Sequence, residues 1–125
     1  MTKMDDKKTG PAHFLAATGY SWAGFRRLLG ESAFRHELLL AFAVLAVLIG
    51  FGVPAGDIVI SAVLFLALFG VEALNTAIEE IIDRISPEFS ATGRHAKDLG
   101  SFAVFCLIAA SCLYSGFALL RALIA

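Results

Sequence analysis

The chain has 125 residues, of which 58% are hydrophobic, and its formal net charge is −1. Its mean hydropathy of +0.79 is far above that of an ordinary soluble domain. The length fits one domain and the composition favours a membrane protein. No nucleic-acid-binding module is present, and the basic residues flank apolar runs, so nucleic acid is excluded as a partner.

Two segments precede the first apolar run. Residues 1–12 are polar and are expected to be disordered. Residues 13–35 mix apolar, aromatic and charged side chains. Four apolar residues of this segment fall near one face at helical spacing: Leu15, Trp22, Phe25 and Leu29. The pattern predicts an amphipathic helix over residues 13–35 that lies on the cytoplasmic membrane surface.

The remainder, residues 36–125, is expected to form one transmembrane domain. Crossing a bilayer takes about 20 apolar residues in a helix. Three segments meet that requirement: residues 38–56, 58–83 and 98–121. A short turn around Pro54 separates the first two. The first apolar run begins too late and is too long for a cleaved signal peptide, so none is expected.

The lysines and arginines predict the orientation of these spans. Six precede the first span, none lies in the turn around Pro54, and three lie between the second and third spans: Arg84, Arg94 and Lys97. The positive-inside rule therefore places the N-terminus and the 84–98 loop in the cytoplasm and the C-terminus outside. A multi-pass protein of the cytoplasmic (inner) membrane is expected.

The second span runs into the polar stretch "VEALNTAIEEIIDR". At ~100° per residue, four of its polar residues share one helix face: Glu72, Asn75, Glu79 and Asp83. Acids at this depth face protein or water, and they are candidates for function. They could supply a general base or bind Mg²⁺ together with substrate phosphates. A solvated helix end is the alternative for the last acids, and it is the preferred interpretation of Glu80, at the edge of the face.

The third span begins with "AKDLGS". Lys97 beside a helix N-terminus could contact a phosphate group, because free backbone amides already favour anions there. In the structural alternative, Asp98 stabilises the helix start while Lys97 extends to the membrane surface. Both interpretations remain open for this stretch alone.

Together, "GYSWAGFRRLLGESAFRHE", "VEALNTAIEEIIDRI" and "AKDLGS" resemble the signature of the prokaryotic diacylglycerol kinases over roughly residues 19–101. The resemblance implies an all-α membrane protein, with an N-terminal amphipathic surface helix and three transmembrane helices, in a homotrimeric bundle. It implies an ATP-dependent kinase that transfers the γ-phosphate of ATP to the hydroxyl of 1,2-diacylglycerol, giving phosphatidate. ATP, diacylglycerol and membrane lipid are the implied partners, and Mg²⁺ accompanies ATP.

The resemblance also implies roles for individual residues. Glu72 matches the catalytic base, Glu31 and Glu79 match the metal ligands, and Asn75 and Asp83 support the site. The positions that match nucleotide contacts are His13, Tyr20, Glu31, Glu79, Glu88, Phe89, Ser90, Lys97 and Asp98. The positions that match lipid contacts are Ser21, Trp22, Arg26, Arg35, Glu72 and Ser101. This chain departs from the family in having His13 where an arginine is usual, and one residue fewer between Gly24 and Glu31.

Two other functions are alternatives to a diacylglycerol kinase. A second branch of the family phosphorylates undecaprenol, but its members lack the residues that match Arg84 and Ser101, and both are present here. A proton-coupled transporter could use Glu72 as a relay, but it would leave Glu31 and Lys97 without a role.

Because three short helices cannot enclose both ATP and a lipid, a site shared between protomers is expected.

Overall fold

The chain is all-helical over residues 9–125, the part that the computed structural model describes. It contains four helices there and no strand: α1 Pro11–Leu28, α2 Ser32–Gly50, α3 Ala55–Ile85 and α4 Ala91–Ile124. The predicted all-α class is thereby confirmed, whereas the homotrimer stays a prediction. Most of the segment predicted to be disordered, residues 1–8, lies outside the described residues.

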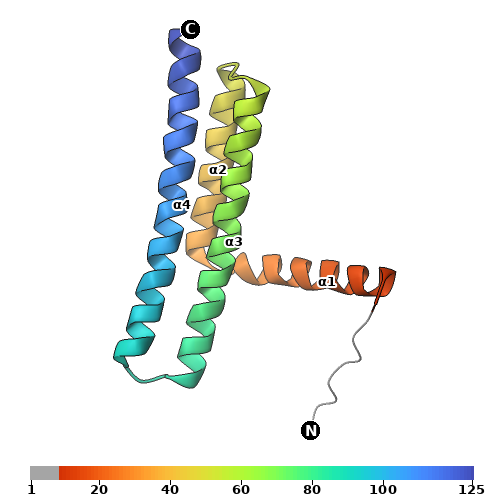
Figure 1. Cartoon of the computed structure of the whole chain (residues 1–125), viewed down its shortest axis with the longest axis vertical. Coiled ribbons are helices and arrows are strands. Elements are labelled where there is room, and N and C mark those ends of the chain that lie inside the picture. The colour runs from red at the N-terminus through yellow and green to blue at the C-terminus, as the bar shows by residue number, and fades with distance from the viewer. Residues whose placement is uncertain (1–8) are drawn as a thin grey trace.

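Helices α2, α3 and α4 run side by side as a bundle, and α1 projects sideways from it (Figure 1). Each of the three bundle helices is long and apolar enough to cross a membrane. The hairpin that joins α3 to α4 lies at the end of the bundle opposite the C-terminus and reaches beyond the level of α1 (Figure 1). The division into a surface helix and a transmembrane domain stays a prediction.

The helix boundaries differ from the expected ones at two places. Residues 13–35 are not one helix, because the chain turns at Leu29–Glu31: the Gly30 amide donates to the carbonyl of Arg27 at 3.1 Å, and Glu31 has an extended backbone. The guanidinium of Arg35, already on α2, donates to the carbonyl of Leu29 at 2.8 Å and fixes this turn. The expected 84–98 loop is also shorter, since only residues 86–90 separate α3 from α4.

An aromatic series connects α1 to the bundle. The ring centroids of Phe25 and Phe34 lie 6.0 Å apart, and those of Phe34 and Phe69 lie 5.3 Å apart. Phe34 is only 1% exposed, so it fixes how α2 is rotated against α3. Two turns further along α2, Ala41 packs in the core cluster with Phe65. These contacts determine which face of α2 looks toward the acids of α3.

Candidate active site

The polar face of α3 passes from the interior of the bundle to its surface. Glu72 is 4% exposed and Asn75 is 8% exposed, whereas Glu79 is partly buried and Asp83 is exposed. Glu80 is exposed, at the edge of this face, as expected from its helical position. Burying a carboxylate as deeply as Glu72 lowers the stability of an apolar bundle. An acid kept in such a place is therefore a candidate for function.

Asn75 links this face to α4 as well as to the next acid. Its side-chain amide donates to Glu79 Oε1 at 3.3 Å, while its oxygen, also buried, has no hydrogen-bond partner among the described residues. Gly100 of α4 makes this position possible, because a Cβ atom there would overlap the Asn75 oxygen. The sequence interpretation missed Gly100, although the quoted motif contains it.

A second missed residue is Glu37, a buried acid on α2. It is only 6% exposed. Its Oε2 atom has no partner among the described residues. The spacing of Phe34, Glu37 and Ala41 could have indicated that Glu37 lies on the buried stripe of α2.

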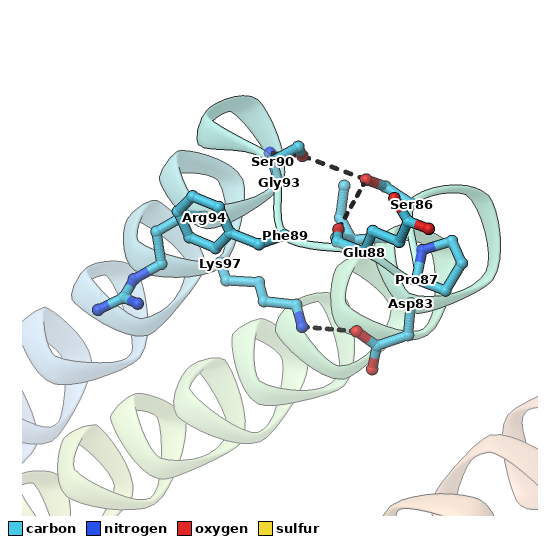
Figure 2. A pocket seen from close by; sticks show the side chains of 10 residues that line it. Asp83, Ser86, Pro87, Glu88, Phe89, Ser90, Gly93, Arg94 and Lys97 are labelled. Atoms are coloured by element: carbon cyan, nitrogen blue, oxygen red, sulfur yellow. Dashed lines mark hydrogen bonds and ion pairs between the residues drawn. The ribbon is translucent and has the colours of Figure 1, made fainter.

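A pocket of about 240 Å³ lies where α3 turns into α4 (Figure 2). The ammonium group of Lys97 reaches across it to Asp83, with Nζ 2.5 Å from Oδ1. Glu88, Phe89 and Ser90, three of the predicted nucleotide contacts, line it as well. Ser90 also caps α4, since its hydroxyl oxygen accepts from the Gly93 amide at 3.0 Å. Asp83 and Lys97 are thus neighbours, which spacing along the chain alone did not indicate.

Asp98 lies beside this pocket but does not line it. Its Oδ1 atom accepts from Arg94 at 3.2 Å, on the exposed side of α4. The contact is an i,i+4 pair between exposed side chains, so it contributes little to stability. The expected helix start at these residues is wrong, because α4 begins at Ala91: Asp98 lies about two turns inside the helix, and Lys97 is not beside its free N-terminal amides.

Arg27, also absent from the predicted set, connects the end of α1 to the acids. Its Nη1 donates to Glu31 at 2.9 Å, and its Nε donates to Glu80 at 2.7 Å. The hydrogen bond that Arg27 donates to Glu31, followed by the one that it donates to Glu80, raises the pKa of the guanidinium further above its already high value. Glu31, at the start of α2, is thereby held next to α3.

Glu31 and Glu79 could bind a metal only if other donor groups complete its coordination shell. No group of three or more His, Cys, Asp or Glu side chains that could bind a metal occurs among the described residues. A metal held entirely by side chains is therefore not indicated. Two carboxylates do fit Mg²⁺, which commonly takes one or two protein carboxylates and completes its shell with water and substrate phosphates.

The remaining predicted residues are not brought to the hairpin pocket within one chain. Five lie exposed on α1: His13, Tyr20, Ser21, Trp22 and Arg26. That helix points away from the bundle (Figure 1), whereas the pocket is lined by residues of the α3–α4 hairpin. Ser101 is exposed on α4, and Arg35 serves the α1–α2 turn.

The fold and the site define a small helical protein with three helices able to span a membrane, buried acids and a polar hairpin pocket. The sequence profile of the prokaryotic diacylglycerol kinases matches residues 19–119. The chain belongs to this family, and the protein is a kinase.

Three relatives, each called diacylglycerol kinase, illustrate the similarity. The Sinorhizobium protein is 50% identical over 112 residues, 90% of this chain and 82% of the relative. The Pseudomonas aeruginosa protein is 44% identical over 100 residues, 78% of this chain and 80% of the relative. The Escherichia coli K12 protein is 37% identical over 108 residues, 84% of this chain and 87% of the relative. None of these matches supports an undecaprenol kinase or a transporter.

Proposed function

We propose that this protein transfers the γ-phosphate of ATP to the hydroxyl of 1,2-diacylglycerol and forms phosphatidate at the cytoplasmic surface of the inner membrane. The observation that carries the proposal is the α3 face. It joins a buried carboxylate, Glu72, to partly exposed Glu79 and exposed Asp83 at the hairpin pocket. A lipid hydroxyl and a nucleotide from the aqueous side could meet along this face.

Glu72 is the proposed general base. It accepts the proton of the lipid hydroxyl while the hydroxyl oxygen forms a bond to the γ-phosphorus of ATP. The bond from that phosphorus to the β–γ bridging oxygen breaks, and ADP leaves. Phosphoryl transfer depends chiefly on alignment and on stabilisation of the phosphate charge. Asn75 would align the site by holding Glu79.

Positive charge at the pocket comes from Lys97, which would exchange its contact with Asp83 for a contact with phosphate. Asp98 and the segment from Glu88 to Ser90 would contact the rest of the nucleotide. Mg²⁺ bound with ATP would supply further charge neutralisation, and Glu31 and Glu79 are the residues that would hold it.

The predicted contacts on α1 lie away from the hairpin pocket of their own chain, and this supports a site shared in a homotrimer. In that arrangement, α1 of one protomer would bring His13 and Tyr20 to the nucleotide of another. The lipid contacts would be Ser21, Trp22, Arg26, Arg35 and Ser101, near the headgroup layer. The many exposed apolar side chains of α2 and α4, such as Phe42 and Phe105, leave surface for partner chains and lipid.

The decisive assay gives purified protein Mg²⁺-ATP and 1,2-diacylglycerol, with undecaprenol in a parallel reaction. We expect ATP-dependent phosphatidate and little undecaprenyl phosphate. Preference for undecaprenol would overturn the substrate proposal but leave a kinase. Failure to phosphorylate either alcohol would remove the kinase reaction as proposed.

The orientation is tested by single cysteines at Ser86, Thr92 and Ala55 in a background that lacks Cys106 and Cys112. Ser86 and Thr92 lie at the α3–α4 hairpin, and Ala55 begins α3 at the other end of the bundle. In intact cells, a membrane-impermeant thiol reagent should label only position 55, and the hairpin should react after the membrane is opened. Hairpin labelling in intact cells would separate the pocket from cytoplasmic ATP and contradict the proposal.

A further inference from the structure

Arg27, in the last turn of α1, joins three helices through one side chain. Among the side-chain hydrogen bonds of residues 9–125, only the one from Arg27 Nε to Glu80 Oε1, at 2.7 Å, connects α1 to α3. The Nη1 atom of the same guanidinium donates to Glu31 Oε1 at 2.9 Å. The start of α2 is therefore linked to α3 through Arg27.

Glu31 stands where a helix cap would be expected, but its side chain does not act as one. Short polar residues such as Ser, Thr, Asp and Asn are preferred at this position, because their side chains accept from the first free amides of the helix. Glu31 is the residue before α2, and its carboxylate makes no capping hydrogen bond. Its bond from Arg27 is instead what fixes the direction of the carboxylate.

The turn between α1 and α2 is shaped around the Arg27 side chain. A Cβ atom at Gly30 would lie 3.2 Å from the Arg27 carbonyl oxygen and 3.6 Å from its Nη1 atom. The absence of a side chain at Gly30 thus leaves room for the guanidinium to fold back over the turn to Glu31.

Stability does not explain this arrangement. The side chains of Arg27, Glu31 and Glu80 are between 37% and 55% exposed, and exposed ion pairs contribute little to stability. A guanidinium held by carboxylates from two other segments does, however, keep a fixed position, because its planar fork fits carboxylate oxygens. What the arrangement provides is a defined place for the Glu31 carboxylate.

We propose that Arg27, anchored on Glu80, is a positioning residue that holds the Glu31 carboxylate in place to bind the Mg²⁺ that accompanies ATP. This inference rests on the proposed assignment of Glu31 as a metal ligand. Within residues 9–125, the Glu31 side chain accepts hydrogen bonds only at Oε1, which leaves Oε2 for the ion. Carboxylates that bind metals are commonly held by such hydrogen bonds, and losing one typically lowers metal affinity by about 10- to 100-fold.

The sign of the effect separates positioning from charge alone. A positive group next to a carboxylate repels a divalent cation, so removing a merely electrostatic Arg27 would strengthen metal binding. Removing a positioning residue weakens metal binding, because the carboxylate loses its fixed direction.

The test measures how the purified full chain binds Mn²⁺ together with an ATP analogue whose β–γ bridge cannot be cleaved. Mn²⁺ takes the same oxygen ligands as Mg²⁺, and its electron paramagnetic resonance signal reports binding without turnover. Arg27→Leu should raise the Kd of the Mn²⁺–nucleotide complex by about 10-fold. Arg27→Lys keeps the charge but lacks the fork, so its Kd should rise by about threefold. The matched control, Arg121→Leu, removes an arginine paired with an acid at the other end of the bundle and should leave the Kd unchanged.

A double variant tests the anchor. Glu80→Gln should raise the Kd by about threefold, and adding it to Arg27→Leu should raise the Kd no further, because Glu80 acts through Arg27. All variants of Arg27 and Glu80 should unfold at the temperature of the natural protein, since the pairs they remove are exposed.

Normal or tighter Mn²⁺–nucleotide binding in Arg27→Leu would overturn the inference, and losses that add in the double variant would overturn the anchoring by Glu80. Glu31→Gln, measured beside them, identifies which proposal fails. If Glu31→Gln binds weakly while Arg27→Leu binds normally, only the positioning role is lost. If Glu31→Gln binds as the natural protein does, the assignment of Glu31 to the metal is itself wrong, and the inference fails with it.

Discussion

The two ends of the bundle bury acids in opposite ways. At the end near the C-terminus, Asp57 of α3 accepts from the Tyr114 hydroxyl at 2.7 Å and forms an ion pair with Arg121. One turn along, the hydroxyls of Ser61 and Ser115 bond to each other at 3.0 Å. At the other end, Glu37 and Glu72 are 6% and 4% exposed and form no salt bridge in residues 9–125, and the Asn75 oxygen has no hydrogen-bond partner there.

This difference distinguishes polar groups that stabilise helix packing from polar groups that do not. Polar groups between membrane helices stabilise packing when they satisfy each other, although each contributes only about 0.6 kcal/mol on average. Polar groups that remain unsatisfied after packing oppose stability. The Asp57 end therefore joins α3 to α4, whereas the Glu72 end keeps polar atoms without partners in residues 9–125, which the proposed substrate would satisfy.

The largest effect is expected from neutralising the acid at the functional end. Glu72→Gln keeps the size and the hydrogen-bonding capacity of the side chain but removes the base. We expect kcat to fall by at least ~100-fold, in line with the loss of general-base catalysis. Steady-state phosphorylation of 1,2-diacylglycerol measures this loss, and size-exclusion chromatography checks that the oligomer is intact.

The matched control is Asp57→Asn, the same kind of change at the other end. It weakens the contacts with Tyr114 and Arg121, so the protein should unfold at a lower temperature than the natural one. Turnover at a temperature where the protein is folded should remain near normal. Similar losses of turnover in both variants would mean that the two ends do not differ in function.

A second prediction, of intermediate size, concerns the acids assigned to Mg²⁺. Glu31→Gln and Glu79→Gln should each raise the Mg²⁺ concentration needed for half-maximal activity by about 10-fold, because Mg²⁺ takes few protein ligands and each one counts. Saturating Mg²⁺ should restore part of the turnover. A titration of activity with Mg²⁺ at fixed ATP measures both effects, with Asp57→Asn as the control.

An unchanged Mg²⁺ response in both variants would make these two acids structural. In that case, the hydrogen bond from Arg27 to Glu31 would only hold α1 in place, as the contacts around Asp57 hold α3 against α4. The comparison between the two ends would survive, but the functional end would be confined to Glu72, Asn75 and their neighbours.

Much of this arrangement follows from properties that are local in the sequence. Hydropathy identified three helices able to span a membrane, because each of these segments is apolar over its own length. Helical geometry placed Glu72 and Asn75 on one face, since ~100° per residue holds whatever packs against the helix. The order of burial along α3, from Glu72 to Asp83, also follows from their positions relative to the apolar run.

What could not be predicted depends on how helices pack. Asp57 and Arg121 are 64 residues apart, and no local pattern in the sequence relates one to the other. Glu37 is buried because Phe34 packs against Phe69 and fixes the rotation of α2, and that rotation is not encoded in one helix alone. The turn at Gly30 was missed because helical spacing continues through it.

The last prediction concerns Gly100, whose role appears only when α3 and α4 are packed together. A Cβ atom at Gly100 would overlap the Asn75 oxygen, whereas one at Gly116, on the same helix, would meet no atom within 4 Å. Gly100→Ala must therefore displace Asn75 and its bond to Glu79, and we expect kcat to fall by about 10-fold, since misplacement of about 1 Å near reacting groups can cost up to 100-fold. Gly116→Ala should keep normal turnover. Both alanines favour helix by up to about 1 kcal/mol, so helix propensity cannot account for a difference in activity. If both variants have the same kcat, the position of Asn75 does not limit the reaction, and its unsatisfied oxygen marks imperfect packing at this end instead of a place for substrate.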